Sequence, residues 1–141
     1  MAGRNWNASV SNEDYLERIY ELIQLKGYAR PVEIARELGV SQPSVTSMIQ
    51  KLAAAGLLNY EKYRGLTLTE AGQRIAESIQ ERHLILTRFL SLLQIPQEAQ
   101  MSDIEGMEHH LSDETVRALA ALSDYLETRP DALKAINSQK D

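Results

Sequence analysis

The sequence predicts a mainly α protein. An N-terminal winged helix-turn-helix with a two-stranded wing is joined by a long helix to an all-α dimerisation domain. Two observations support this fold. Hydrophobic residues recur at helical spacing along most of the chain, and residues 57–69 interrupt that pattern with two β-prone runs around a turn. We place the winged domain at residues 1–71 and the helical domain at residues 72–141.

The first three predicted helices have recognisable ends. The first helix ends at Gly27, and Pro31 opens a short second helix that Gly39 terminates. Ser41 can cap a third helix that continues to Ala55. A short helix, a three-residue turn and a longer helix form the helix-turn-helix pattern.

The segment after the third helix reads LLNYEKYRGLTLT. Two short β-prone runs flank a charged turn that contains Lys62, Arg64 and Gly65. This arrangement predicts a β-hairpin. Its position directly after the third helix identifies the hairpin as a wing.

A long helix follows the wing, with Thr69 as its cap and about 25 residues that reach Gln94. This length exceeds what a small winged domain needs, so we expect the helix to connect the two domains. Beyond Pro96, Ser102 and Glu105 predict a capping box for a short helix that ends at residue 110.

The last predicted helix is capped by Ser112 and ends at Pro130, and we expect residues 131–141 to form a frayed polar tail. The long and last helices have more aliphatic surface than a domain of this size can bury alone. This excess predicts a homodimer.

The bulk composition excludes several classes of protein. Hydrophobic residues make up 43% and charged residues 25% of the 141 residues, which is typical of a globular protein. No apolar run approaches the roughly 18 residues of a membrane span, and the N-terminus lacks the order of a signal peptide. We therefore expect a cytoplasmic protein with no membrane partner. The absence of cysteine excludes disulfides, thiolate metal sites and cysteine nucleophiles.

The net charge of -5 is unevenly distributed. Residues 72–141 have seven basic and twelve acidic side chains, whereas residues 26–69 have six basic and three acidic ones. The local basic surplus in the helix-turn-helix and wing suits contact with DNA.

Three groups of potential metal ligands lie on predicted helices. The groups are Asp14 and Glu17, then His83, then Glu105, Glu108 and His109. Within the first and third groups the residues are spaced so that they share one face of a helix. Together they offer four carboxylates and two imidazoles, which suit Mn²⁺ or Fe²⁺ better than a structural zinc ion.

Each group also has a simpler interpretation. Acidic residues in the first turns of a helix, such as Asp14 and Glu17, are typical dipole-stabilising surface charges. His83 alone is typical of an exposed histidine. Glu105-Gly-Met-Glu-His-His is the stronger indication of a metal site, although His110 points away from the shared face by about 100°.

The span from Asp14 to Tyr125 resembles the manganese transport regulator branch of the diphtheria-toxin-repressor-like family of metal-dependent repressors. The matching motifs are KGYAR at 26–30, SQPSVTSMIQKL at 41–52, YEKYRGLTLT at 60–69 and DIEGMEHHLS at 103–112. The resemblance implies a cytoplasmic homodimer that represses manganese uptake genes by binding double-stranded palindromic operator DNA. It also implies a site for two Mn²⁺ ions per subunit, formed by Asp14, Glu17, His83, Glu105, Glu108 and His109.

The same resemblance distinguishes manganese from iron. Iron-responsive relatives typically have methionine and cysteine at the positions that match Asp14 and Glu105, and this chain has oxygen donors at both. Manganese is therefore the expected effector, although Fe²⁺, Co²⁺, Zn²⁺ or Cd²⁺ could bind in vitro.

The expected DNA contacts lie on the third helix and the wing. Gln42 and Ser44 are candidates to read base edges, and Pro43 could contact a thymine methyl group. Thr46, Ser47, Lys51 and Lys62 are candidates to contact the DNA backbone, and Arg64 could enter a minor groove. Ser41 is a further candidate, although it is needed as a helix cap whether or not it contacts DNA. The third helix has no arginine, which argues against strong guanine readout.

Two rival functions remain open at this stage. A di-metal carboxylate enzyme would require a Glu-x-x-His pair on each of two helices, and here His109 falls four residues after Glu105. We therefore expect no enzymatic activity and no organic substrate. A winged-helix regulator that responds to iron or to an organic effector is the other alternative.

Overall fold

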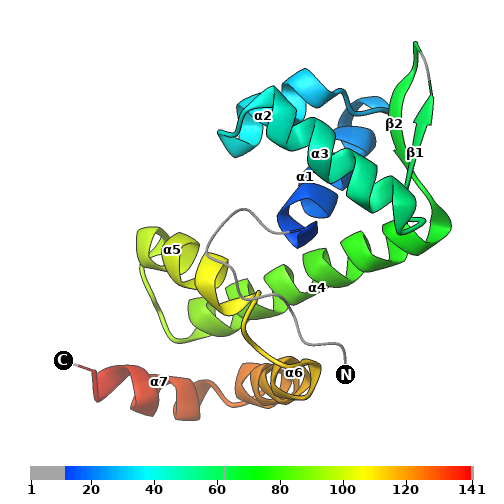
Figure 1. The fold of residues 1–141 in the computed structure, drawn as a ribbon. Coiled ribbons are helices and arrows are strands. Elements are labelled where there is room, and N and C mark those ends of the chain that lie inside the picture. Colours follow the sequence, from blue (N-terminus) through cyan, green and yellow to red (C-terminus); the bar gives the residue numbers. More distant parts are fainter. Residues whose placement is uncertain (1–11, 62, 141) are drawn as a thin grey trace. The chain divides into compact units, whose positions relative to one another are not determined.

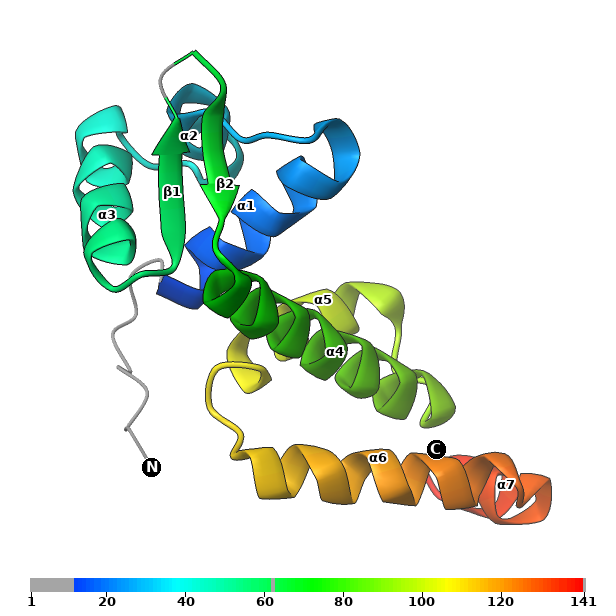
Figure 2. The same cartoon turned by 90° about the vertical axis from the view of Figure 1, so that its right-hand side faces the viewer.

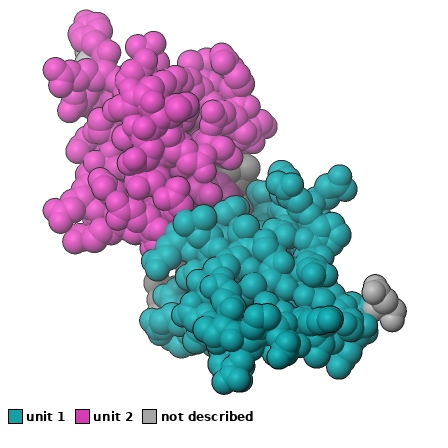
Figure 3. Space-filling model, turned by 180° about the vertical axis from the view of Figure 1, so that it is seen from behind, with its two compact units in different colours: residues 1–6, 81–141 teal, residues 7–80 magenta. Residues whose placement is uncertain are grey.

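The computed structural model describes residues 12–61 and 63–140. Within these residues the chain forms seven helices and one two-stranded sheet (Figure 1). It divides into two compact units, one ending at Gln80 and the other beginning at Glu81 (Figure 3). The division falls inside helix α4, which is continuous from Glu70 to Leu92.

The first unit is a winged helix-turn-helix, as the sequence predicts. It consists of α1 (Asn12–Lys26), α2 (Pro31–Leu38), α3 (Gln42–Ala54), β1 (Leu58–Glu61) and β2 (Gly65–Leu68), followed by the start of α4. Gly39 ends α2 in the left-handed conformation with φ of 67°. The Ser41 side chain caps α3 by accepting a hydrogen bond from the Ser44 backbone N–H at 3.3 Å.

One hydrophobic core stabilises this unit. Each helix buries one apolar face, and the wing adds the inward residues of both strands. The larger side chains with no exposed surface are Ile19, Ile34, Val45 and Leu66. Because these four residues come from α1, α2, α3 and β2, the core fixes all of these elements against one another.

The wing is held by a backbone bridge that sequence analysis did not predict. β1 and β2 pair antiparallel, with Leu58 opposite Leu68, and β1 lies beside α3 while β2 lies beside α1 (Figure 2). Ala29 adds a further bridge, because its N–H and C=O both bond to Leu66. Gly65 sits at this bridge with φ of 92°, and a Cβ there would lie 2.6 Å from the Ala29 carbonyl oxygen. Only glycine satisfies both conditions.

The second unit is entirely helical. It consists of the end of α4 with α5 (Gln97–Met107), α6 (Asp113–Glu127) and α7 (Pro130–Ser138). A small core of Leu86, Leu90 and Ile104 joins α4 to α5. Ser112 caps α6 as predicted, since its side chain accepts a hydrogen bond from the Thr115 N–H at 3.2 Å. No helix of the described residues is long and apolar enough to cross a membrane.

The predicted start of the short helix is wrong. α5 begins at Gln97, directly after Pro96, so Ser102 lies inside the helix and forms no capping box. The fixed φ of Pro96 (-57°) and the helix-forming residues that follow it start the helix earlier. α5 also ends sooner, at Met107, which makes Glu108 the C-cap. His109 therefore lies in a turn after α5.

The predicted polar tail is also wrong. Residues 130–138 form α7, because proline at the first position of a helix favours initiation as well as ending the preceding helix. Asn137 donates a hydrogen bond to the Leu92 carbonyl at 3.2 Å, and Lys140 donates to the Leu93 carbonyl. These contacts satisfy carbonyls at the C-terminal end of α4, which need partners from outside the helix.

The junction between α3 and α4 is close-packed within the first unit. The Thr69 hydroxyl donates to the Gly56 carbonyl at 2.7 Å and accepts from the Gly72 N–H at 3.1 Å. A Cβ on Gly72 would lie 2.1 Å from the Leu57 carbonyl oxygen, which is backbone and cannot rotate away. Gly72 thus allows the start of α4 to pack against the segment that follows α3.

We predict that Gly72→Ala destabilises the metal-free protein by about 1–3 kcal/mol, the usual effect of overpacking. Urea unfolding followed by circular dichroism measures this change. Gly106→Ala is the matched control, because that helical glycine has ordinary φ and nothing within 4 Å of an added Cβ. The control should be neutral or slightly more stable. Equal stability of Gly72→Ala and the parent would contradict the proposed packing.

Candidate metal centre and DNA-binding surface

Four of the six predicted metal ligands come together in the second unit. The Nδ1 atom of His83, on α4, lies 2.9 Å from Oε2 of Glu108. The Nε2 atom of His109 lies 3.5 Å from Oε1 of the same carboxylate. Glu105, one turn earlier on α5, is close enough to raise the pKa of Glu108. Glu108 is therefore the centre of the group.

Glu108 occupies an unfavourable place for an isolated negative charge. The residue is only 5% exposed, and burial is the main reason that its pKa is raised. The hydrogen bond and charge of His83, and the charge of His109, lower this pKa, whereas Glu105 raises it further. A buried carboxylate with a second carboxylate nearby is stabilised by positive charge.

The donor chemistry fits a divalent ion. The group offers carboxylate oxygens and imidazole nitrogens and no sulfur, which is the set that hard and borderline divalent cations prefer. The two glutamates also supply the negative charge that such an ion would neutralise.

The other two predicted ligands lie in the first unit. Asp14 and Glu17 are three residues apart in the first turns of α1, so their side chains share one face of that helix. Both are partly buried, next to the buried residues Tyr15, Leu16 and Ile19. Neighbouring core residues hold this part of α1 in place, so the two carboxylates are presented from a rigid element.

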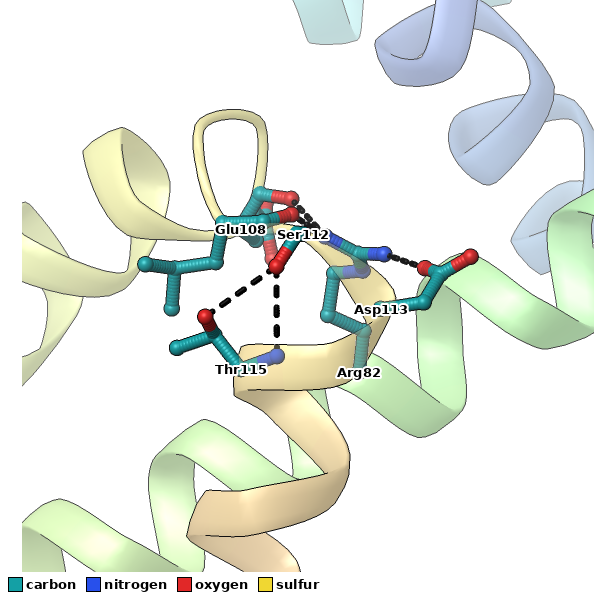
Figure 4. Close-up of polar contacts among 6 residues, drawn as sticks. Arg82, Glu108, Ser112, Asp113 and Thr115 are labelled. Carbon is teal, nitrogen blue, oxygen red and sulfur yellow. Dashed lines mark hydrogen bonds and ion pairs between the residues drawn. The ribbon is translucent and has the colours of Figure 1, made fainter. Parts of the chain in front are cut away.

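Sequence analysis missed Arg82, which is only 4% exposed. Its guanidinium donates to the backbone carbonyl of Glu108 at 3.2 Å and pairs with Asp113 (Figure 4). The signal for this residue is its position in the buried stripe of α4, between Ile79 and Leu86. A charged residue in an apolar stripe needs internal partners, and the pattern identifies such a position before the partners are known.

The predicted DNA contacts in the first unit are exposed. On α3 the exposed candidates are Gln42, Pro43, Ser44, Thr46, Ser47 and Lys51. Ser41 is engaged as the cap of α3, with its hydroxyl 2.8 Å from that of Ser44. Arg64 projects from the wing with a side chain that is 83% exposed, 3.7 Å from Glu61. Lys62 lies outside the described residues.

Comparison with known families assigns both halves of the chain. Residues 8–66 match the family described as iron dependent repressor, N-terminal DNA binding domain. Residues 69–137 match iron dependent repressor, metal binding and dimerisation domain. The chain therefore belongs to the iron-dependent repressor family, whose members are DNA-binding transcriptional repressors and not enzymes. The second match, together with the donor set, identifies a domain that binds divalent metal.

Within the family, the chain belongs to the MntR branch, as its sequence motifs predict. It is 45% identical over 130 residues to the HTH-type transcriptional regulator MntR of Lysinibacillus sphaericus, covering 92% of this chain and 94% of the relative. It is 44% identical over 128 residues to the MntR of Bacillus velezensis, covering 91% and 90%.

Solved structures support the same fold. The manganese regulator SloR superposes with a TM-score of 0.71 at 33% identity over 81% of this chain and 54% of that one. ScaR with bound Zn²⁺ gives a TM-score of 0.71 at 36% identity over 82% and 54%. This chain spans about half the length of these solved chains.

Proposed function

We propose that the protein is a manganese-activated repressor that binds palindromic operator DNA as a homodimer and regulates manganese uptake genes. The observation that supports this most is the buried Glu108 carboxylate between two imidazoles, in a family of metal-binding DNA regulators. Operator DNA lies in the cytoplasm, so we place the protein there.

The proposed ligands are the six residues that sequence analysis selected. In this proposal His83, Glu105, Glu108 and His109 form a preassembled group in the second unit. Asp14 and Glu17 complete the ligand set from α1, and the six donors are enough for two ions per subunit. The ions would supply positive charge that offsets four carboxylates. Without it, repulsion among these carboxylates disfavours the ligand arrangement.

We expect the site to prefer manganese over iron because of the donor atoms at two positions. Asp14 and Glu105 are oxygen donors where softer ligands would favour iron-like metals. The relatives named MntR agree with this choice. Solved structures of ScaR contain Zn²⁺ and Cd²⁺, so we expect Zn²⁺, Cd²⁺, Co²⁺ and Fe²⁺ to compete for this site in vitro.

We assign DNA recognition to the exposed face of α3 and to the wing. Gln42 and Ser44 lie near the start of α3, where a recognition helix meets base edges. The positive end of the helix and the Lys51 ammonium favour phosphate contact. Arg64, at the exposed tip of the wing, is suited to a minor groove.

The homodimer is proposed to form through α4 and α6. Three large apolar side chains of these helices are exposed: Leu84 at 62%, Leu122 at 44% and Tyr125 at 55%. Exposed apolar residues on adjacent helices are typical of an interface that is buried by a second copy. A symmetric dimer would present two recognition helices to the two halves of a palindrome.

The proposed regulation requires a difference in affinity. Metal can shift the protein toward the DNA-binding conformation only if its ligands are better arranged there than in other conformations. His83 lies on α4. The start of this helix contacts the segment after α3, because the Thr69 hydroxyl bonds to both the Gly56 carbonyl and the Gly72 N–H. Ligation of His83 therefore acts on a helix that also supports the recognition helix.

We predict that Mn²⁺ raises operator affinity at least tenfold, a coupling of about 1.4 kcal/mol. Electrophoretic mobility shifts with excess Mn²⁺ or with chelator measure the ratio, and Mg²⁺ at the same ionic strength controls for general charge effects. Equal affinity with Mn²⁺ and with chelator would refute the proposal and favour a regulator that responds to an organic effector.

We also predict that Asp14→Met changes metal selectivity. A thioether offers little to Mn²⁺, so the variant should need much more Mn²⁺ for operator binding while its Fe²⁺ or Co²⁺ response stays close to that of the parent. Glu108→Ala and His109→Ala should impair the response to every metal, because they remove donors without replacing them. Operator binding against free metal under anaerobic conditions measures these responses.

Glu13→Met is the matched control for this selectivity experiment, because Glu13 lies in the same turn of α1 and is not a proposed ligand. Its Mn²⁺ response should equal that of the parent. If Asp14→Met also leaves the Mn²⁺ response unchanged, Asp14 is only a helix-terminal charge.

A further inference from the structure

We propose that Arg82 is a positioning residue that holds the turn with two metal ligands, Glu108 and His109, in its binding conformation. This inference rests on the proposed function, because it concerns the same metal centre. It adds a residue that is not itself a ligand. The contacts of Arg82 that support this role all lie within the second unit.

Arg82 contacts the turn at both ends. Its Nη1 donates to the backbone carbonyl of Glu108 at 3.2 Å and to the carbonyl of Leu111. Its Nη2 pairs with the carboxylate of Asp113, the first residue of α6 (Figure 4). The planar guanidinium thus joins the end of α5, the following turn and the start of α6, which a single-point donor could not do.

The turn combines local and distant hydrogen bonds. Residues 108–110 follow the last turn of α5, where helix carbonyls lack intrahelical partners. The N–H groups of Glu108, His110 and Leu111 bond locally, to the carbonyls of Ile104 and Met107. Arg82 donates to two carbonyls of this segment, those of Glu108 and Leu111, and so ties it to α4.

Arg82 and His83 are consecutive residues of α4 that hold Glu108 in two ways. Arg82 binds the main-chain carbonyl of Glu108, and His83 lies 2.9 Å from its side chain. The Arg82 contact fixes the position of the Glu108 backbone, and the His83 contact orients its carboxylate. Mutation of a residue that orients a metal ligand commonly lowers metal affinity by about 10–100-fold.

The burial of Arg82 supports a specific role. A guanidinium that is only 4% exposed is costly unless its donors are satisfied. Here the acceptors are backbone carbonyls of the ligand-bearing turn and one carboxylate, which is itself 58% exposed. The buried guanidinium of Arg82 therefore holds the turn at residues 108–111 in one conformation.

Arg88 provides a control on the same helix, with a side chain that is 37% exposed against 5% for Arg82. It donates to the Ala120 carbonyl at 3.3 Å and forms ion pairs with Asp124 and Glu127 of α6. These contacts join α4 to α6 with the same chemistry, and none of them reaches the turn at 108–111. Arg88 therefore reports the general cost of losing an arginine between these helices.

The test compares Arg82→Met with Arg88→Met in the full chain. Isothermal titration calorimetry gives the Mn²⁺ affinity, and thermal unfolding of the metal-free proteins gives their stability. We expect Arg82→Met to bind Mn²⁺ about 10–100-fold more weakly, and Arg88→Met to stay within about twofold of the parent. The visible absorption of the Co²⁺-loaded proteins should change in shape for Arg82→Met only, because it reports ligand geometry.

A milder pair keeps the proposal testable if Arg82→Met does not fold. Asp113→Asn weakens the Arg82 contact at an exposed position, and Asp124→Asn is its counterpart for Arg88. Asp113→Asn should weaken Mn²⁺ binding at least threefold and Asp124→Asn should not. Equal affinities within each foldable pair, or an unchanged Co²⁺ spectrum, would overturn the role of Arg82. Failure of the parent to bind Mn²⁺ would instead refute the proposed function.

Discussion

The carboxylate of Glu108 is buried close to a second carboxylate, that of Glu105, and residues of α4 and of the turn after α5 contact it. Two imidazoles approach its oxygens, Arg82 binds its main chain, and Ile104, four residues earlier, anchors the helix in the core. Burial raises the pKa of Glu108, so a cation that replaces the proton is favoured there. In the proposed function this cation is a divalent metal ion.

The helix that carries His83 also explains how such a centre could influence DNA binding. α4 starts where Thr69 bonds to the end of α3 and where Gly72 lies against the Leu57 backbone. It ends where α7 satisfies its last carbonyls. In the proposed function, ligation of His83 would act on α4, whose first turn contacts the segment that follows α3.

Local signals were sufficient to predict most of the fold. Gly39, Ser41 and Thr69 form the predicted helix ends, and the charged turn around Gly65 forms the predicted hairpin, because caps and turns depend on residues close in sequence. Helix spacing also selected the candidate metal ligands. The structure brings His83, Glu105 and His109 close to Glu108, and their role as ligands stays a prediction.

The errors came from interactions between distant residues or from competing local signals. Ser102 and Glu105 have the spacing of a capping box, yet Pro96 starts the helix first. α7 was missed because its contacts with Leu92 and Leu93 span more than forty residues of sequence. The Ala29 bridge to Leu66 and the contacts of Arg82 are equally non-local. A single sequence does not show which distant partner a buried charge will meet.

In the proposed function, metal binding around Glu108 and operator DNA binding are thermodynamically coupled. The most direct test is calorimetric titration of Mn²⁺ into the protein alone and into the protein saturated with operator duplex. Because coupling is reciprocal, the duplex should raise Mn²⁺ affinity by the same factor, at least tenfold, by which Mn²⁺ raises operator affinity. A Mn²⁺ affinity that is identical with and without the duplex would contradict the account.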